Sequence, residues 1–110
     1  MQLSKKVLID ISEDAVNSKG VQTDGLLLSG IVFPAAMTGT AVTFDFSFDG
    51  STWVDVVETD GTEVSYTVSA GNVTRVDPSG WAFATAGFVR VSSDATELAD
   101  SNIQLIFKQS

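Results

Sequence analysis

The chain has 110 residues, of which 6 are basic and 14 acidic, so its net charge is −8, and it contains neither histidine nor cysteine. This length predicts a single domain over residues 1–110. The missing residue types exclude disulfides, thiolate metal sites, serine–histidine triads and histidine metal sites within the chain.

The composition also separates the chain from several other classes. Apolar residues make up 44% of it and charged residues 18%, which is typical of a folded rather than a disordered chain. Phosphate backbones and anionic lipids attract clustered lysine and arginine, whereas this chain is acidic and has one basic pair, Lys5 and Lys6. We therefore expect neither nucleic acid nor a membrane as a partner.

Residues 1–24 start with an alternating pattern. Val7, Ile9 and Ile11 fall on one face of a predicted first strand. The apolar run there has three residues, too few for a signal peptide, whose core needs about seven. No run approaches the roughly 20 apolar residues of a membrane span. We expect a soluble protein made inside the cell, in which residues 1–24 form an N-terminal strand or arm.

Two longer apolar segments follow. Residues 26–33 form a run that predicts a strand covered on both faces, with Gly30 as a bulge and Pro34 as its end. Residues 42–48 alternate strictly, so that one valine and the three phenylalanines, Phe48 included, share one face. A period of two over this length predicts a half-buried strand with the large apolar side chains on the buried face.

Two Asp-Gly pairs divide the next stretch into short segments. Asp49-Gly50 and Asp60-Gly61 flank residues 53–58, and residues 63–69 follow. Asp-Gly between alternating segments is a strong hairpin signal, because both turn positions must accept a positive φ. The pattern predicts a three-stranded meander, followed by another turn at residues 70–72.

The rest of the chain contains further short strand candidates separated by loops and turns. The stretch 81–87 is aromatic and alanine-rich and follows no clear period, and residues 12–19 and 94–100 are expected to be loops. Asp94 and Glu97 have the spacing of a capping box, but one leucine is too little to dock a helix. About eight strand candidates with turns between them predict an all-β fold, an antiparallel β-sandwich or jelly roll. The remaining candidate strands are residues 73–77, 88–92 and 103–108.

The carboxylates offer the first candidates for chemistry, and their spacing argues against it. Calcium ligands occur at tight spacing, whereas Asp45, Asp49, Asp55, Asp60 and Glu63 are spread through the predicted meander. No two carboxylates stand out as the pair that glycoside hydrolysis requires. We therefore expect no metal, no cofactor, no catalytic residues and no enzyme activity.

Three aromatic residues form the only candidate interaction surface. Trp53, Tyr66 and Trp81 could stack against sugar rings, as aromatic platforms of carbohydrate-binding modules do. They could instead pack in the core or at a protein interface, because each buries a large apolar area. We favour packing or a protein interface over sugar binding.

One run of motifs extends from residue 33 to residue 53. An apolar strand ends in Pro34-Ala35, the turn Thr38-Gly39-Thr40 follows, and then come a Phe-containing segment, Asp49-Gly50 and Trp53. In this order the motifs resemble small β-rich proteins encoded in the structural modules of tailed bacteriophages and prophages. The likeness spans roughly residues 25–108 and continues in residues 76–78, 80–81, 88–91 and 102–105.

This resemblance implies a virion protein, and within that group a head decoration (cement) protein on the outer capsid surface. Such proteins often form trimers at quasi-threefold positions, so the implied partners are the major capsid protein and further copies of this chain. An acidic protein suits the outer face better than the DNA-facing one. Two alternatives stay open: a tail- or fibre-associated sandwich that binds glycans through Trp53, Tyr66 and Trp81, and a bacterial surface adhesion module.

Overall fold

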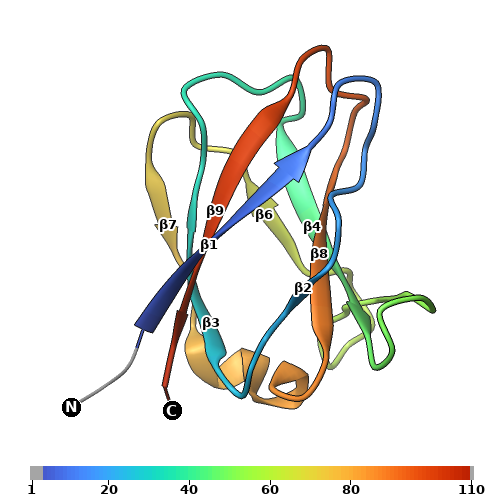
Figure 1. Cartoon of the computed structure of the whole chain (residues 1–110), viewed down its shortest axis with the longest axis vertical. Helices are drawn as coiled ribbons and strands as arrows, with labels where there is room; N and C mark the ends of the chain where they lie inside the picture. The colour runs from blue at the N-terminus through green and yellow to red at the C-terminus, as the bar shows by residue number, and fades with distance from the viewer. Residues whose placement is uncertain (1–3, 110) are drawn as a thin grey trace.

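Two antiparallel β-sheets pack face to face in the computed structural model, which describes residues 4–109 (Figure 1). We name them the β1 sheet and the β4 sheet after their strands. The β1 sheet has the order β1 (Ser4–Ile11), β9 (Ser101–Lys108), β3 (Leu27–Val32) and β7 (Val73–Arg75). The β4 sheet has the order β2 (Val21–Gln22), β8 (Phe88–Ser93), β4 (Ala41–Ser47) and β5 (Val54–Asp55), and β6 (Ser65–Thr67) also pairs with β4. The expected all-β sandwich is confirmed.

Alternation along the long strands supplies the core between the sheets. In β9 the buried apolar residues are Ile103, Leu105 and Phe107, and in β8 they are Val89 and Val91. Every second side chain of a strand points to the same face, so these residues meet across the sandwich. They belong to one connected apolar cluster, which also contains Ile9, Ile11, Leu28, Ile31, Phe33, Val42, Phe44, Phe46, Val56, Val76, Trp81 and Ala84.

The expected bulge lies in β3. The register with β9 shifts between Leu28 and Gly30, so that Ser29 is the extra residue beside the glycine. The Ser29 hydroxyl donates a hydrogen bond to the carbonyl oxygen of Ile106 at 3.2 Å, and the Ser29 carbonyl accepts one from the Val76 amide at 3.1 Å. The polar groups that the bulge frees from the ladder are therefore satisfied.

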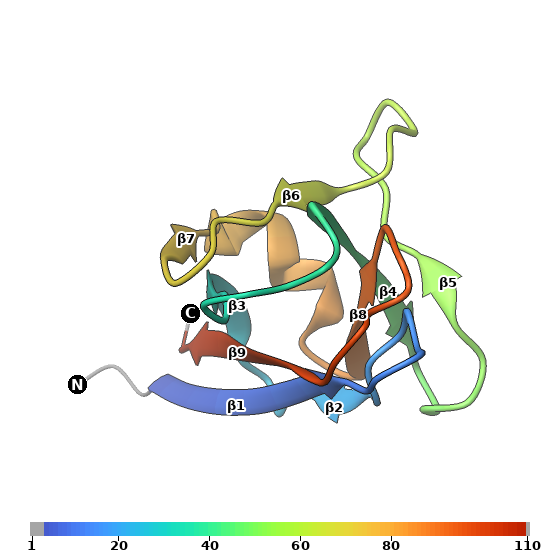
Figure 2. The ribbon, with the colours of Figure 1, turned by 90° about the horizontal axis from the view of Figure 1, so that it is seen from above.

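The predicted three-stranded meander is wrong in its third strand. β5 pairs with β4, but β6 returns to β4 as well, with Val42 opposite Tyr66, so β5 and β6 follow one another along the same edge. The hairpin at residues 57–63 projects between them and is closed by one bridge, Val57 to Glu63 (Figure 2). Tyr66 packs against the core from this position, which a strand placed beyond β5 could not do.

The Asp-Gly turns also differ from the expectation in detail. Only the glycines take a left-handed φ, 80° at Gly50 and 88° at Gly61. Asp49 instead turns its carboxylate back, and Oδ1 accepts hydrogen bonds from the amides of Ser51 at 2.8 Å and Thr52 at 2.9 Å. These bonds lower the pKa of Asp49 to about 2. Aspartate therefore serves here as a side-chain acceptor rather than as a residue with positive φ.

The stretch without a clear period contains a 3₁₀ helix, η1 (Pro78–Ala84), which covers one end of the sandwich (Figure 1). Its start is defined by Asp77, whose carboxylate accepts a hydrogen bond from the Ser79 amide at 3.1 Å, and by Pro78 in the first turn. Within residues 4–109 no helix is long and apolar enough to cross a membrane. The short strand β2 has no counterpart among the predicted strands.

Candidate interaction surface

One end of the sandwich exposes large apolar side chains. Phe48, just after β4, is 81% exposed, and Phe83, in η1, is 52% exposed. Both rings pack edge-on against the buried Phe46, with centroid distances of 4.8 Å and 5.6 Å. Val54 and Val57 are also more than half exposed. We call Phe48, Val54, Val57 and Phe83 the apolar end.

Phe48 departs from the expectation that it shares the buried face of its strand. β4 ends at Ser47, whose hydroxyl accepts hydrogen bonds from the amides of Asp49 at 3.3 Å and Gly50 at 2.8 Å. The chain therefore turns at this point, and Phe48 lies past the part of the sheet that the core covers. The sequence alternation continues one step further than the strand does.

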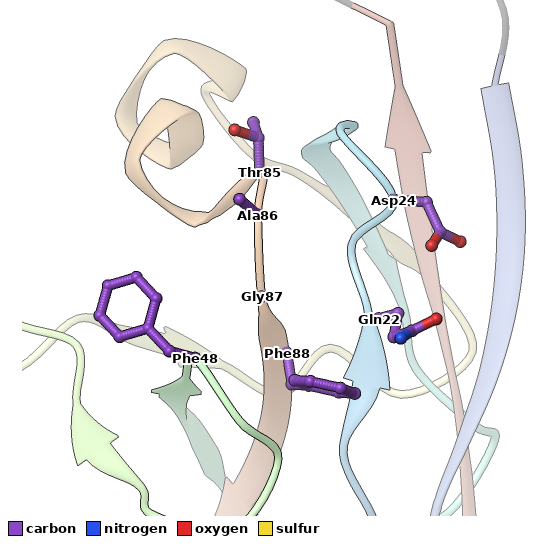
Figure 3. A pocket seen from close by; sticks show the side chains of 7 residues that line it. All are labelled: Gln22, Asp24, Phe48, Thr85, Ala86, Gly87 and Phe88. Atoms are coloured by element: carbon purple, nitrogen blue, oxygen red, sulfur yellow. The ribbon is translucent and has the colours of Figure 1, made fainter.

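Two surface hollows flank the apolar end, and neither has a lysine or arginine in its lining. Figure 3 shows the first, in which Phe48 lies on one side of the start of β8 and Gln22 and Asp24 lie on the other. The second has a volume of about 420 Å³ and contains Val57 and Phe83 together with two acids, Glu58 and Asp77. Glu58 and Asp77 thus place negative charge beside the second hollow, whereas Asp24 at the first is paired with Lys5 at 2.6 Å.

Trp81 fixes the position of the exposed Phe83. Its own side chain is only 4% exposed, and its ring lies edge-on to Phe44 at 4.9 Å and stacks on Phe83 at 5.7 Å. The indole Nε1 donates a hydrogen bond to the hydroxyl oxygen of Tyr66 at 3.4 Å, and Tyr66 is itself edge-on to Phe44 at 5.9 Å. Trp81 and Tyr66 are therefore partners in packing beneath the surface.

Trp53 lies apart from these two residues. The Arg90 guanidinium lies over its ring, 4.6 Å from the centroid. Its ring also covers Gly20, where a Cβ atom would come within 2.5 Å of the indole. The structure thus brings Tyr66 and Trp81 together and leaves Trp53 elsewhere, so the three do not form one aromatic platform.

Beside Trp53, a charged pair crosses the outer face of the β4 sheet. Arg90 Nε donates to Asp45 Oδ2 at 2.8 Å, and Asp45 stands directly opposite Asp55 across the β4–β5 pair. A hydrogen bond with Asp45, together with its negative charge, raises the pKa of Asp55. Cross-strand register decides which charges meet, and the sequence pattern gave no register for β5.

At the other end of the sandwich, three loops meet around a buried carboxylate (Figure 1). We call residues 12–19, 34–40 and 94–100 the loop end. Glu97 is 1% exposed and accepts hydrogen bonds from the amides of Thr38 and Gly39 and the hydroxyls of Ser93 and Ser101, at 2.6–2.9 Å. Burial raises the pKa of Glu97, but these four bonds outweigh it and leave the pKa below its usual value.

Asp94 supports the same turn from outside. Its carboxylate accepts hydrogen bonds from the amide and the hydroxyl of Thr40, both at 2.8 Å, which lower the pKa of Asp94. Residues 94–100 form a loop, as expected in spite of the capping-box spacing of Asp94 and Glu97. The two carboxylates cap the amides of the 38–40 turn rather than those of a helix. Within residues 4–109 no group of three or more acidic side chains is arranged to hold a metal ion.

Comparison with known proteins shows a similar fold and no family. No family model matches the chain, and no curated protein does. Among solved structures, the SPBc2 prophage-derived protein YomS has a TM-score of 0.51 at 10% identity, with 97% of this chain and 96% of that chain covered. At this identity the likeness shows the fold alone.

A second solved structure is more distant. It is a protein of Bacillus endospore appendages, described as a novel family of disulfide-linked pili, with a TM-score of 0.41 at 16% identity. The match covers 100% of this chain and 90% of that one. A likeness at this TM-score has no bearing on the function of the present chain.

Proposed function

We propose that this chain is a structural protein of a phage virion, a decoration protein that binds the outer capsid surface and stabilises the shell. The observation that carries the proposal is the apolar end, where Phe48 and Phe83 expose their rings on a rigid support. Exposed apolar groups held in place by a packed core are typical of protein-binding surfaces. The phage-like motifs and the prophage origin of YomS, which shares the fold, support the same assignment.

The charge around the apolar end predicts which kind of partner surface would be complementary to it. Glu58 and Asp77 line one of the two hollows beside it, and the chain carries a net charge of −8. Asp24, at the other hollow, is already paired with Lys5. A complementary site on the major capsid protein would be an apolar pocket with basic side chains at its rim. Nucleic acid and membranes are not part of the proposal, because both would meet an acidic surface. The protein would be made in the host cytoplasm and reside on the outside of the virion.

The proposed role is mechanical rather than catalytic. A protein that binds only the assembled shell stabilises that state by mass action, as any ligand selective for one state does. The phage-like resemblance further suggests a homotrimer in which each copy bridges neighbouring capsid subunits. Burial of the exposed parts of Phe48 and Phe83 would contribute about 2–4 kcal/mol per copy before the costs of association.

The experiment is a rebinding assay on shells of the phage that encodes the chain. Mass spectrometry of purified virions should first find hundreds of copies, and a few copies would indicate a tail location instead. Shells lacking the protein are then titrated with wild-type chain and with the double variant Phe48→Ser, Phe83→Ser. We expect the double variant to bind about 100-fold more weakly. The matched control is Leu98→Ser, a side chain 75% exposed at the loop end, which should bind like the wild type.

The alternative is a tail- or fibre-associated module that binds glycans. Of its three candidate residues, Trp81 is buried and hydrogen-bonded to Tyr66, and Tyr66 packs against the core, so Trp53 is the candidate outside this packed pair. A glycan array probed with wild type and Trp53→Ala distinguishes the two proposals. Binding that disappears in Trp53→Ala would favour the glycan role over capsid decoration.

A further inference from the structure

β1 is the longest strand at a sheet edge in the described part of the chain. It pairs with β9 over all eight residues, from Ser4 opposite Lys108 to Ile11 opposite Ser101. Within residues 4–109 no strand pairs with its other side, whereas the other edge strands are only two or three residues long. Figure 2 shows β1 at the margin of the fold, with β9 on its inner side.

A long free edge is a template for another strand. In an antiparallel ladder about half of the amides and carbonyls of a strand point away from any one neighbour, so half of those in β1 are free for a second partner. β1 contains no proline or glycine, and the bulge of this sheet lies in β3. Beside the free edge runs a hollow of about 360 Å³, lined by Leu8, Ile9 and Asp10 on one side and by residues 19–21 on the other.

The outer face of β1 is self-complementary. Its inward residues Ile9 and Ile11 are buried, while Lys6, Leu8 and Asp10 are exposed, Leu8 to 57%. The exposed face therefore reads positive, apolar, negative, with Leu8 at the centre. Lys5 adds nothing to this face, because it forms an ion pair with Asp24 of the same chain at 2.6 Å.

We propose that two copies of this chain associate through their β1 edges, antiparallel and with Leu8 opposite Leu8 of the second copy. In this register Lys6 of each copy stands opposite Asp10 of the other, which gives two charge pairs, and the two Leu8 side chains meet on the twofold axis. Directly opposite residues of an antiparallel pair share a face, so all three contacts form on the exposed side. The result is one continuous sheet with four strands from each copy.

Neighbouring registers do not match in the same way. A shift of two residues in either direction places Leu8 opposite Lys6 or opposite Asp10 and removes both charge pairs. A shift of one residue would place exposed residues of one copy opposite buried residues of the other. Charge complementarity therefore selects a second copy in one register. The contact is isologous and joins copies in pairs, so it would link two of the suggested trimers rather than form one. It uses no residue of the apolar end and is independent of the proposed capsid contact.

The test exchanges the charges. In Lys6→Asp alone, or Asp10→Lys alone, every charge pair of the homodimer becomes a like-charge pair, and we expect association to weaken at least tenfold in sedimentation velocity. An equimolar mixture of the two single variants restores both pairs across the interface, and so does the double variant Lys6→Asp, Asp10→Lys in one chain. Both are expected to associate like the wild type, which a fold defect in either single variant could not explain.

A second measurement checks the register. The chain has no cysteine, so Leu8→Cys introduces a single thiol whose Cβ would lie about 5 Å from its counterpart. Air oxidation should give a disulfide-linked dimer, whereas Leu98→Cys, at a more exposed position of the loop end, should not. The proposal is overturned if the wild-type chain stays monomeric in sedimentation velocity at every protein concentration of a dilution series. It is also overturned by an oligomer, a trimer included, whose stability is the same in both single charge variants.

Discussion

The two ends of the sandwich manage their surfaces in opposite ways. At the loop end, a charged side chain is taken out of water and every one of its bonds is made: Glu97 is 1% exposed and has four donors. At the apolar end, Phe48 is 81% exposed and Phe83 is 52% exposed, and both rings contact the same buried Phe46. The loop end exposes single apolar side chains such as Leu98, but its buried charge finds every partner within the chain. The comparison is therefore between hydrogen bonds that hold one end together and a pair of exposed rings, for which we propose a partner, at the other.

Glu97→Ala is the substitution that should damage the loop end most. It would leave the amides of Thr38 and Gly39 without acceptors, whereas the two serine hydroxyls can rotate to new ones. Each buried amide without a partner costs about 1–3 kcal/mol, so we expect the free energy of unfolding to fall by about 3 kcal/mol. Urea denaturation followed by circular dichroism measures it.

The control for this substitution is the neighbouring Leu98→Ala. Leu98 is on the same loop but faces water, so Leu98→Ala should change the free energy of unfolding of the protein by less than about 0.5 kcal/mol. Equal effects of the two substitutions would mean that Glu97 is not the residue that holds the loops.

Gly39→Ala should lower the free energy of unfolding by about 2 kcal/mol, because the added Cβ disturbs the packing of the loop end. A Cβ at Gly39 would overlap the Ser93 hydroxyl and lie 2.9 Å from Asp94 Oδ1, so the Glu97 network would have to move. The matched control is Gly80→Ala in η1, where a Cβ meets nothing within 4 Å. Thermal unfolding of the two variants compares them directly, and an equally stable Gly39→Ala would contradict the close fit of the turn.

The sheets were predictable because their signal is local. Alternation in residues 42–48 and 103–108 gave strands close to β4 and β9, and the Asp-Gly pairs gave the positions of two turns. Which strand pairs with which is not local. The chain after Asp60-Gly61 could add beyond β5 or return to β4, and burial of Tyr66 against the core decides for β4.

The candidate surface was predictable only in part. The sequence marks Trp53, Tyr66 and Trp81 as aromatic candidates and favours packing or a protein interface for them. It also predicts Phe48 on the buried face, because alternation does not show where a strand ends. The Glu97 network joins residues about 60 positions apart, so no local spacing in the sequence could show it.

Acid should weaken the loop end before it affects the apolar end. The folded-state pKa of Glu97 lies below its usual 4.5, so its stabilisation is fully present above about pH 4.5 and is lost as the pH falls through the lowered value. Asp49, with a folded pKa of about 2, and Asp94 act in the same direction. The pKa of Asp55 is raised, so its protonation above pH 3.8 favours the folded state slightly.

We therefore expect a free energy of unfolding that does not fall between pH 7 and about 5 and falls below about 4.5, where protonation of Asp55 offsets part of the loss. Urea titrations at a series of pH values measure this curve. Glu97→Gln should fall less steeply in acid than the wild type, and Asp55→Asn, which lacks the offset, should fall more steeply. A wild-type curve that already declines between pH 7 and 5 would contradict the lowered pKa values.

Phe48→Ser should have the smallest effect on folding and a large one on binding. The ring contacts the edge of Phe46 but is mostly in water, so we expect the free energy of unfolding to change by less than about 1 kcal/mol. Phe46→Ala, two residues earlier and still within β4, should cost about 3–4 kcal/mol because that ring is buried. Paired urea titrations give both values. If Phe48→Ser were as costly as Phe46→Ala, Phe48 would be part of the core, and its exposed ring would no longer point to a partner. If instead Phe48→Ser unfolds like the wild type and fails to bind shells, the exposed ring of Phe48 serves recognition and not folding.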